Sequence, residues 1–184
     1  MNAPKPVVTA EQLLHMSSPG KRYELVRGGL VEMEPTGGLH GLVAAKIAWL
    51  LQEHIKTHHG GMVFAAETGF RLELQPDTVL APDVAYVSPG RLRPGDVSEA
   101  YPELAPDIVV EVLSPSDSPM AVERKTRTWI ELGAPIVWIV DPRARTVTVH
   151  EAADAVRVLA GSDRLAAASV LPEFACAVDR LFEI

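Results

Sequence analysis

The stretch Asp107-Ile-Val-Val-Glu-Val-Leu113 decides the fold, because its apolar residues make a continuous run of strand length. A run of this kind is typical of a buried strand. Glu111 stands in its middle, and a lone carboxylate there is unfavourable unless another group compensates its charge. We therefore expect a buried core strand with a charged partner close to Glu111.

On the carboxyl side of this strand the pattern becomes helical and then returns to strands. The sequence predicts a helix over residues 120–132, strands over 136–140 and 146–150, an edge strand over 156–159, and then a loosely patterned tail. A helical crossover between two strands predicts a mixed sheet flanked by helices. The expected fold class is therefore α/β, or a mixed α+β arrangement.

On the amino side, Gly28-Gly29 between two short runs is a two-residue hairpin signal. The predicted elements are a short helix over residues 9–16, hairpin strands over 23–27 and 30–33, a long helix over 39–57, one strand or a bent pair over 62–74, and a strand over 83–87. The segment 88–106, rich in proline, glycine and arginine, is expected to be a long loop. Loops of that length are more often functional or mobile than incidental.

The 184 residues suit one domain over 1–184, with residues 1–8 expected to be flexible. The net charge of −7 argues against broad nucleic-acid binding through a basic surface, but leaves room for a local basic patch. The start lacks a signal-peptide pattern and no segment has the apolar length of a membrane helix, so we expect a cytoplasmic location. Cys176 is the single cysteine, which excludes an internal disulfide and a thiolate metal cluster.

Two further charged residues stand in apolar surroundings. Asp83 opens the run Asp83-Val-Ala-Tyr-Val87, and Lys125 falls between Trp129 and Leu132 on the apolar face of its predicted helix, at about 100° per residue. Each has an ordinary explanation: a turn or cap residue for Asp83, a lysine whose head reaches water for Lys125, and a structural ion pair for Glu111. In combination they predict hydrolytic chemistry. Two acids on neighbouring strands can hold a hard divalent cation, and a lysine can orient water or offset charge in the transition state.

The histidines offer a different kind of site. His40 projects near the start of the long helix, roughly onto its buried side. His54 and His58 have the i, i+4 spacing of zinc ligands, and His59 follows, but no nearby acid or cysteine completes a recognisable set. We expect packing for His54 and surface exposure for His58 and His59.

Two segments carry a resemblance to a known family. Ala81-Pro-Asp-Val-Ala-Tyr-Val87 followed by Ala105-Pro-Asp-Ile-Val-Val-Glu-Val-Leu-Ser-Pro-Ser116 resembles the Uma-two family of restriction-endonuclease-like proteins, within the PD-(D/E)XK nuclease superfamily. Further matches in the expected order are Tyr23–Met33, His40, Lys125 and Gly133–Pro142. The resemblance extends from Leu13 to Phe182.

This resemblance implies a restriction-endonuclease-like core and assigns roles to the charged residues. Asp83 matches the metal-binding aspartate and Glu111 the second acidic ligand of Mg²⁺ or Mn²⁺, with the carbonyl of Val112 as a further oxygen. The superfamily's common lysine position, two residues beyond the second acid, holds Leu113 here. Lys125 matches a lysine that this family supplies from the following helix.

Three more residues are candidates for supporting roles by the same resemblance, namely Glu24, His40 and Glu67. The chain departs from the family's pattern at the entry to the second helix, where Ala121 stands at an often acidic position and Pro119 alters the approach. Neither departure removes a predicted ligand. They bear on whether that loop still positions nucleic acid.

Three functions remain open on the sequence. The first is a Mg²⁺-dependent endonuclease that hydrolyses phosphodiester bonds in DNA, acting as a homodimer because each site handles one strand. The second is a catalytically silent nucleic-acid-binding or regulatory domain on the same fold. The third is an interaction module in which the buried charges form only an ion pair.

Overall fold

The computed structural model describes residues 7–16, 20–58, 60–151 and 155–183. Its central sheet has the order β10-β9-β8-β7-β6-β3. These strands are β3 (Met62–Ala65), β6 (Val84–Val87), β7 (Ile108–Val112), β8 (Ile136–Asp141), β9 (Thr146–Glu151) and β10 (Ala155–Ala160). β7 and β8 run parallel, joined by helix α3 (Pro119–Glu131), and their other described neighbours are antiparallel. The predicted mixed sheet is confirmed, with β7 inside it.

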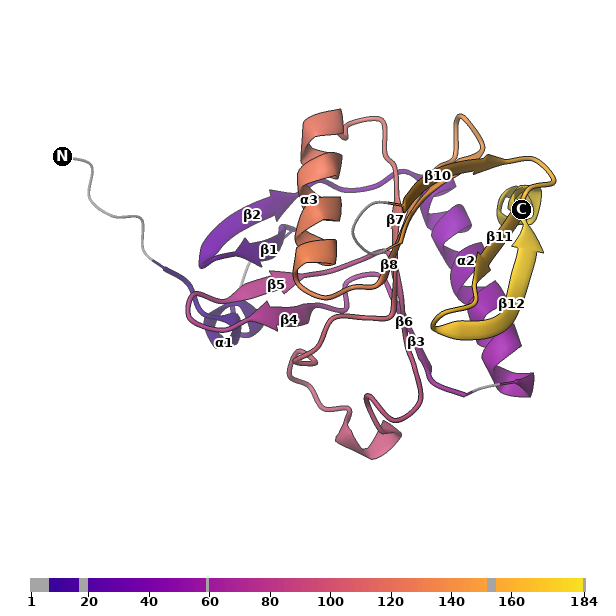
Figure 1. Ribbon diagram of the computed structural model, residues 1–184. Helices are drawn as coiled ribbons and strands as arrows, with labels where there is room; N and C mark the ends of the chain where they lie inside the picture. Colours follow the sequence, from indigo (N-terminus) through magenta and orange to yellow (C-terminus); the bar gives the residue numbers. More distant parts are fainter. Residues whose placement is uncertain (1–6, 17–19, 59, 152–154, 184) are drawn as a thin grey trace.

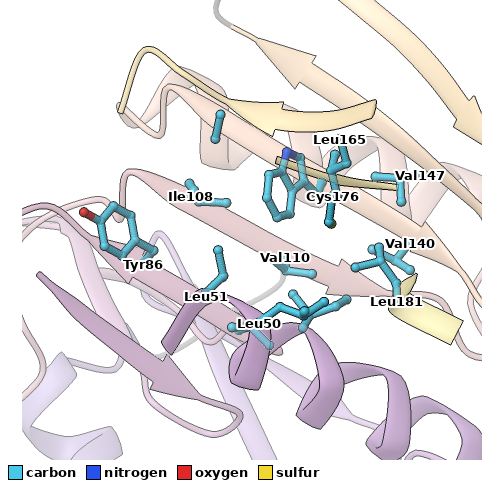
Figure 2. Close-up of a cluster of buried hydrophobic side chains, with 14 of the residues drawn as sticks. Leu50, Leu51, Tyr86, Ile108, Val110, Val140, Val147, Leu165, Cys176 and Leu181 are labelled. Atoms are coloured by element: carbon cyan, nitrogen blue, oxygen red, sulfur yellow. The ribbon is translucent and has the colours of Figure 1, made fainter. Parts of the chain in front are cut away.

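One face of this sheet is covered by α2 (Gly38–Thr57) and by the end of the chain, as Figure 1 shows. The alternate residues Ile108 and Val110 of β7 project into this layer, where Leu50 and Leu51 of α2 meet Leu181 (Figure 2). All of these side chains are buried. The apolar face of α2 is the one that its helical spacing predicts.

The prediction of a loosely patterned tail is wrong. Residues beyond 160 form a hairpin of β11 (Arg164–Ala167) and β12 (Leu171–Ala177), followed by a 3-10 helix, Val178–Phe182, and all three pack onto the core. A register shift between Ala166 and Ala167 breaks the alternation of apolar residues. Small alanines also weaken the contrast between inward and outward positions, which hides the strands from a periodicity argument.

The other face carries α3 and a second sheet of order β2-β1-β5-β4, visible beside α3 in Figure 1. It contains the predicted hairpin, β1 (Arg22–Val26) and β2 (Gly29–Met33), with β4 (Phe70–Glu73) and β5 (Thr78–Leu80). The predicted turn at Gly28-Gly29 is wrong by one residue: Val26 pairs with Gly29, and the turn residues are Arg27 and Gly28, both with positive φ. The segment 62–74 is thus two strands in two different sheets, separated by a turn in which Glu67 has a φ of 74°. β5 has three residues, too few to show a period in the sequence.

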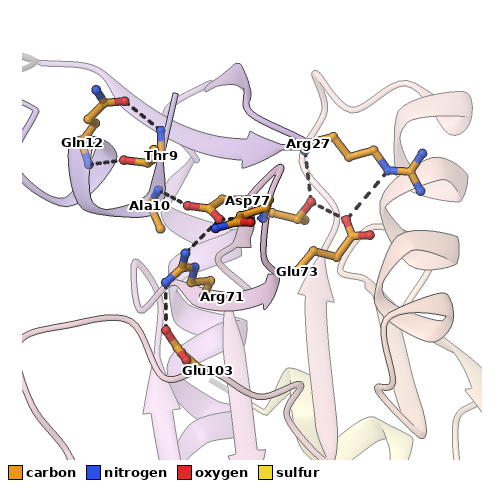
Figure 3. Close-up of polar contacts among 10 residues, drawn as sticks. Thr9, Ala10, Gln12, Arg27, Arg71, Glu73, Asp77 and Glu103 are labelled. Carbon is orange, nitrogen blue, oxygen red and sulfur yellow. Dashed lines mark hydrogen bonds and ion pairs between the residues drawn. The ribbon is translucent and has the colours of Figure 1, made fainter. Parts of the chain in front are cut away.

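A buried carboxylate ties the N-terminal helix α1 (Ala10–Leu14) to the second sheet (Figure 3). Asp77 accepts the N–H of Ala10 at 2.7 Å and pairs with Arg71 at 2.9 Å. Thr9 caps the helix in the predicted capping box with Gln12. Of the segment expected to be flexible, residues 1–6 lie outside the described part, whereas Val8 donates its N–H to the carbonyl of Gly28.

The long loop over 88–106 leads back to β7 and is fastened at its base. Asp107 accepts the backbone N–H of Ser88 at 2.7 Å and a hydrogen bond from the guanidinium of Arg91 at 2.8 Å.

No helix among the described residues is long and apolar enough to cross a membrane.

Candidate active site

Three predicted site residues converge where β6 and β7 meet the amino-terminal half of α3. Asp83 directly precedes β6 and is bonded to both neighbours of Glu111 on β7. Its N–H donates to the carbonyl of Val110 at 3.0 Å, and its carboxylate accepts the N–H of Val112 at 2.7 Å. The strand pairing therefore brings the two predicted acidic ligands together.

Glu111 is held on the face of the sheet that α3 covers. The Lys125 ammonium lies 2.9 Å from its Oε1 and 3.0 Å from its Oε2. The indole Nε1 of Trp129 donates a further hydrogen bond to Oε1 at 2.8 Å. Lys125 is thus the charged partner that we expected for Glu111. Trp129, one helical turn later on α3, is a second hydrogen-bond donor to the same carboxylate.

Lys125 does not extend its head to solvent. Its Nζ lies 2.9 Å from Oε1 of Glu24 on β1 and donates to the carbonyl of Ala81 at 3.2 Å. Glu24 also accepts the N–H of Ala81 at 2.9 Å. The lysine therefore connects α3 to both sheets through two carboxylates and one carbonyl.

His40 supports Asp83 from the first turn of α2. Its Nε2 lies 3.1 Å from Oδ2 of Asp83, the oxygen that also accepts the N–H of Val112. His40 is buried, with 8% of its surface exposed. No hydrogen bond from the described residues ends on Oδ1 of Asp83, so that oxygen remains available to a ligand.

Burial and neighbouring charges shift the pKa values of the residues in this cluster. Burial raises the pKa of Glu111 to about 7; the charge of Lys125 opposes this rise, and the charges of Asp83 and Glu24 add to it. Burial alone would lower the pKa of Lys125, but Glu111 and Glu24 outweigh it and raise that pKa, so the amine stays protonated. Burial likewise works against a charged His40, and the hydrogen bond and charge of Asp83 more than compensate, so the pKa of His40 is raised.

The cluster lies in a groove of about 930 Å³ between the second sheet, α3 and the start of α2. Glu67 also lines this groove, but it pairs with Arg22 at 3.0 Å and is largely exposed. Among the described residues, no contact joins Glu67 to Asp83 or Glu111. The structure thus brings together Asp83, Glu111, Lys125, Glu24 and His40. Glu67 contacts Arg22 instead and is not part of this cluster.

The donor set fits a hard divalent cation with few protein ligands. The carboxylates of Glu24 and Glu111 both contact the Lys125 ammonium, whereas that of Asp83 pairs with His40. Among the described side chains no group of three or more His, Cys, Asp or Glu has the geometry of a metal site. Mg²⁺ often uses one or two carboxylates and completes its shell with water and substrate phosphate, which this arrangement permits.

The histidines at the end of α2 are placed differently from His40. The rings of His54 and His58 stack with centroids 4.3 Å apart, and His54 contacts the edge of Phe174. His54 is half-buried and His58 is exposed, whereas His59 lies outside the described residues.

Trp129 and Ala81 were not among the predicted site residues. The helical wheel places Trp129 on the same face as Lys125, but a tryptophan on an apolar face is ordinarily a core residue, and Trp129 is fully buried. Its hydrogen-bonding N–H is the signal that could have identified it, because a buried indole N–H usually has a partner. The Ala81 contact is made by backbone atoms, which the residue type does not reveal.

Comparison with known proteins gives a consistent result. Residues 10–179 match the Uma2 family, described as "Putative restriction endonuclease". A crystal structure described as a putative nuclease belonging to DUF820, from Anabaena variabilis, superposes with a TM-score of 0.81 at 18% sequence identity. The match covers 95% of this chain and 97% of that one, and at this identity it shows a shared fold. No protein with a curated function matches the chain. The family match spans nearly the whole chain, and the chain belongs to the Uma2 family.

Proposed function

We propose that the protein is a Mg²⁺-dependent endonuclease that hydrolyses phosphodiester bonds in DNA. The observation that carries the proposal is the convergence of Asp83, Glu111 and Lys125 beside an open groove. The family's description and the nuclease-like fold support it. Hydrolysis of a phosphodiester needs groups that position water and offset charge, and these residues supply both.

Asp83, Glu111 and the carbonyl of Val112 would hold the metal ion. Oδ1 of Asp83 is free of hydrogen bonds from the described residues, and Oε2 of Glu111 has one described contact, with Lys125. A divalent ion at such a site lowers the pKa of bound water and neutralises phosphate charge. Mn²⁺ would serve in place of Mg²⁺, since both prefer oxygen ligands.

Lys125 acts as a donor and a fixed positive charge. Because its pKa is raised, it carries a proton at neutral pH and is unsuited to act as a general base. Its N–H groups would orient the attacking water or offset charge on the phosphate in the transition state. Two neighbouring residues hold these groups in place. Glu24 pairs with the Lys125 ammonium, and the indole N–H of Trp129 donates to Glu111.

His40 orients the other predicted ligand. Its ring nitrogen on Oδ2 of Asp83, together with the N–H of Val112, leaves Oδ1 as the free oxygen of that carboxylate. Partners of this type fix the direction of a metal ligand, and their loss commonly lowers metal affinity or activity about 10- to 100-fold.

The test is cleavage of supercoiled plasmid, which separates nicked from linear product. With Mg²⁺ or Mn²⁺ the protein should nick or linearise the plasmid, and EDTA, Asp83→Ala and Lys125→Ala should each abolish cleavage. Arg127→Ala is the matched control, because Arg127 is exposed on α3 and pairs with Glu123. Folded protein that cuts none of a panel of duplex DNA, single-stranded DNA and RNA would refute the proposal.

We further infer that the protein works in the cytoplasm as a homodimer. A symmetric pair would present one site to each strand of a duplex. Light scattering during size-exclusion chromatography tests the dimer, and linear plasmid that forms without prior accumulation of nicked circles would accompany it. A monomer under conditions of full activity would contradict this part of the proposal.

A silent nucleic-acid-binding domain is the second candidate, and one observation favours it. Lys125 directs its ammonium at Glu24, Glu111 and Ala81, which accounts for all three of its N–H groups. If the ion pairs never open, the lysine cannot reach a substrate. Binding of DNA without turnover in Mg²⁺ and Mn²⁺ would select this reading over the first.

A further inference from the structure

Arg124 differs from the other basic residues of the groove. Four basic and seven acidic side chains line the groove, apart from His40. Lys21 pairs with Glu32, Arg22 with Glu67, and Lys125 with Glu24 and Glu111. Arg124 has no carboxylate partner in the described part of the chain, although acids outnumber bases around it.

The position of Arg124 on α3 places it in the lining of the groove. Ala121, Arg124, Lys125 and Thr128 all line this cavity, and their i, i+3, i+4, i+7 spacing places them on one stripe of the helix. Arg124 is exposed, whereas its neighbour Lys125 is drawn inward by its carboxylates.

The acid next to Arg124 in sequence does not neutralise it. Glu123 projects from another side of the helix and pairs at 2.9 Å with Arg127, one turn further on. Glu123 and Arg127 both line a separate cavity between α3 and the edge of the central sheet. Two arginines on one helix are therefore placed differently: one neutralised away from the site, and one charged beside it.

We propose that Arg124 binds a phosphate of the nucleic-acid backbone next to the scissile bond and so positions the substrate strand across Asp83, Glu111 and Lys125. This role rests on the proposed nuclease function and adds a substrate contact to it. A guanidinium donates paired hydrogen bonds to phosphate oxygens and is always charged at neutral pH. In an acid-rich groove it gives the approaching backbone a fixed point of attraction.

The test compares Arg124→Gln with Arg127→Gln in the full-length protein. Both variants remove one positive charge from an exposed arginine of α3, so they change the net charge equally. Binding of a fluorescein-labelled 20-base-pair duplex is measured by anisotropy between 50 and 200 mM NaCl, with Ca²⁺ replacing Mg²⁺. Cleavage in Mg²⁺ is measured in parallel.

Arg124→Gln should weaken binding about 5- to 30-fold, and its plot of log affinity against log salt should be shallower by about 0.9 for the one lost phosphate contact. KM should rise more than kcat falls, and Arg127→Gln should behave as wild type. Equal affinities and slopes for the two variants would overturn the role of Arg124 while leaving the nuclease proposal intact. A wild-type protein that neither binds nor cuts nucleic acid would overturn both.

Discussion

The Lys125 ammonium lies 2.9 Å from Oε1 of Glu111, so a lysine on α3 neutralises the one carboxylate inside the buried strand β7. Glu24 approaches the same ammonium from the second sheet at 2.9 Å. The Lys125 side chain thus links α3 to β7 and to β1. It also places a positive charge where the proposed chemistry needs one. Its replacement should therefore affect both stability and activity.

Lys125→Met should remove cleavage and also destabilise the fold. Loss of one partner from a buried ion pair typically reduces the free energy of unfolding by about 3–5 kcal/mol. Without the lysine, Glu111 and Glu24 repel each other most when both are ionised, so the loss should grow with pH. Urea unfolding at pH 5 and pH 8 measures this, with Lys56→Met on the exposed side of α2 as the control. A Lys125→Met protein that stays folded and cuts as well as wild type would remove Lys125 from the site.

Trp129→Phe separates hydrogen bonding from packing, because it keeps an aromatic ring and deletes the N–H that Glu111 accepts. A hydrogen bond to a charged group contributes about 1.5–3 kcal/mol, and a freed Glu111 should lower cleavage about tenfold or more. Trp138→Phe is the matched control: Trp138 is equally buried, and its Nε1 has no hydrogen-bond partner among the described residues. If both variants lose the same activity, Trp129 acts only by filling space.

Asp77→Asn should destabilise the region around α1 without touching the groove chemistry. The N–H of Ala10 lowers the pKa of Asp77 most strongly, burial opposes this, and Arg71 adds to the lowering. A lowered acid pKa gives stability that is present above the unfolded value, 3.8, and is lost as pH falls through the folded value. Wild type should therefore lose more stability than Asp77→Asn as the pH falls from 5 to 2. Urea midpoints that fall in parallel for the two proteins over that range would show this contribution to be absent.

Metal affinity should rise with pH through about 7, because Glu111 must lose its proton to become a ligand and its pKa is raised to about 7. Below that pH the affinity for Mn²⁺ should approach a tenfold change per pH unit for the one proton released. For folding the sign is opposite: a raised pKa contributes stability below 4.5 that is lost as pH rises through about 7. Calorimetric titration of Mn²⁺ between pH 5.5 and 8 measures the first effect. The same profile in Glu111→Gln would assign the proton to another group.

Strong local signals made much of the fold predictable. The apolar run around Glu111, the hairpin signal and the apolar stripe of α2 each specify an element through nearby residues, and the structure confirms these elements, with the hairpin turn one residue earlier than predicted. β5 and the hairpin β11–β12 could not be found in this way. Their strands are short or irregular, and they are stabilised by contacts with residues far away in the sequence.

The site was predictable where charge conflicted with burial. Glu111 and Lys125 are each unfavourable alone, and this conflict by itself indicates that each has a partner. Asp83 was a candidate from its position, but its role as a metal ligand and the role of His40 rested on the family resemblance, because an acid before a strand and a histidine on a helix have many ordinary explanations. The direct contact of Glu24 with Lys125 depends on how the second sheet packs against α3, and no local pattern in the sequence encodes that distance.

The location of bound Mn²⁺ in a crystal soaked at pH 8 decides whether Asp83 and Glu111 form a metal site. An anomalous difference peak should appear about 2.0–2.5 Å from Oδ1 of Asp83 and from one oxygen of Glu111, with Lys125 beside it. A soak that leaves this position empty at saturating Mn²⁺, with Lys125 still between Glu24 and Glu111, would contradict metal-dependent hydrolysis at these residues.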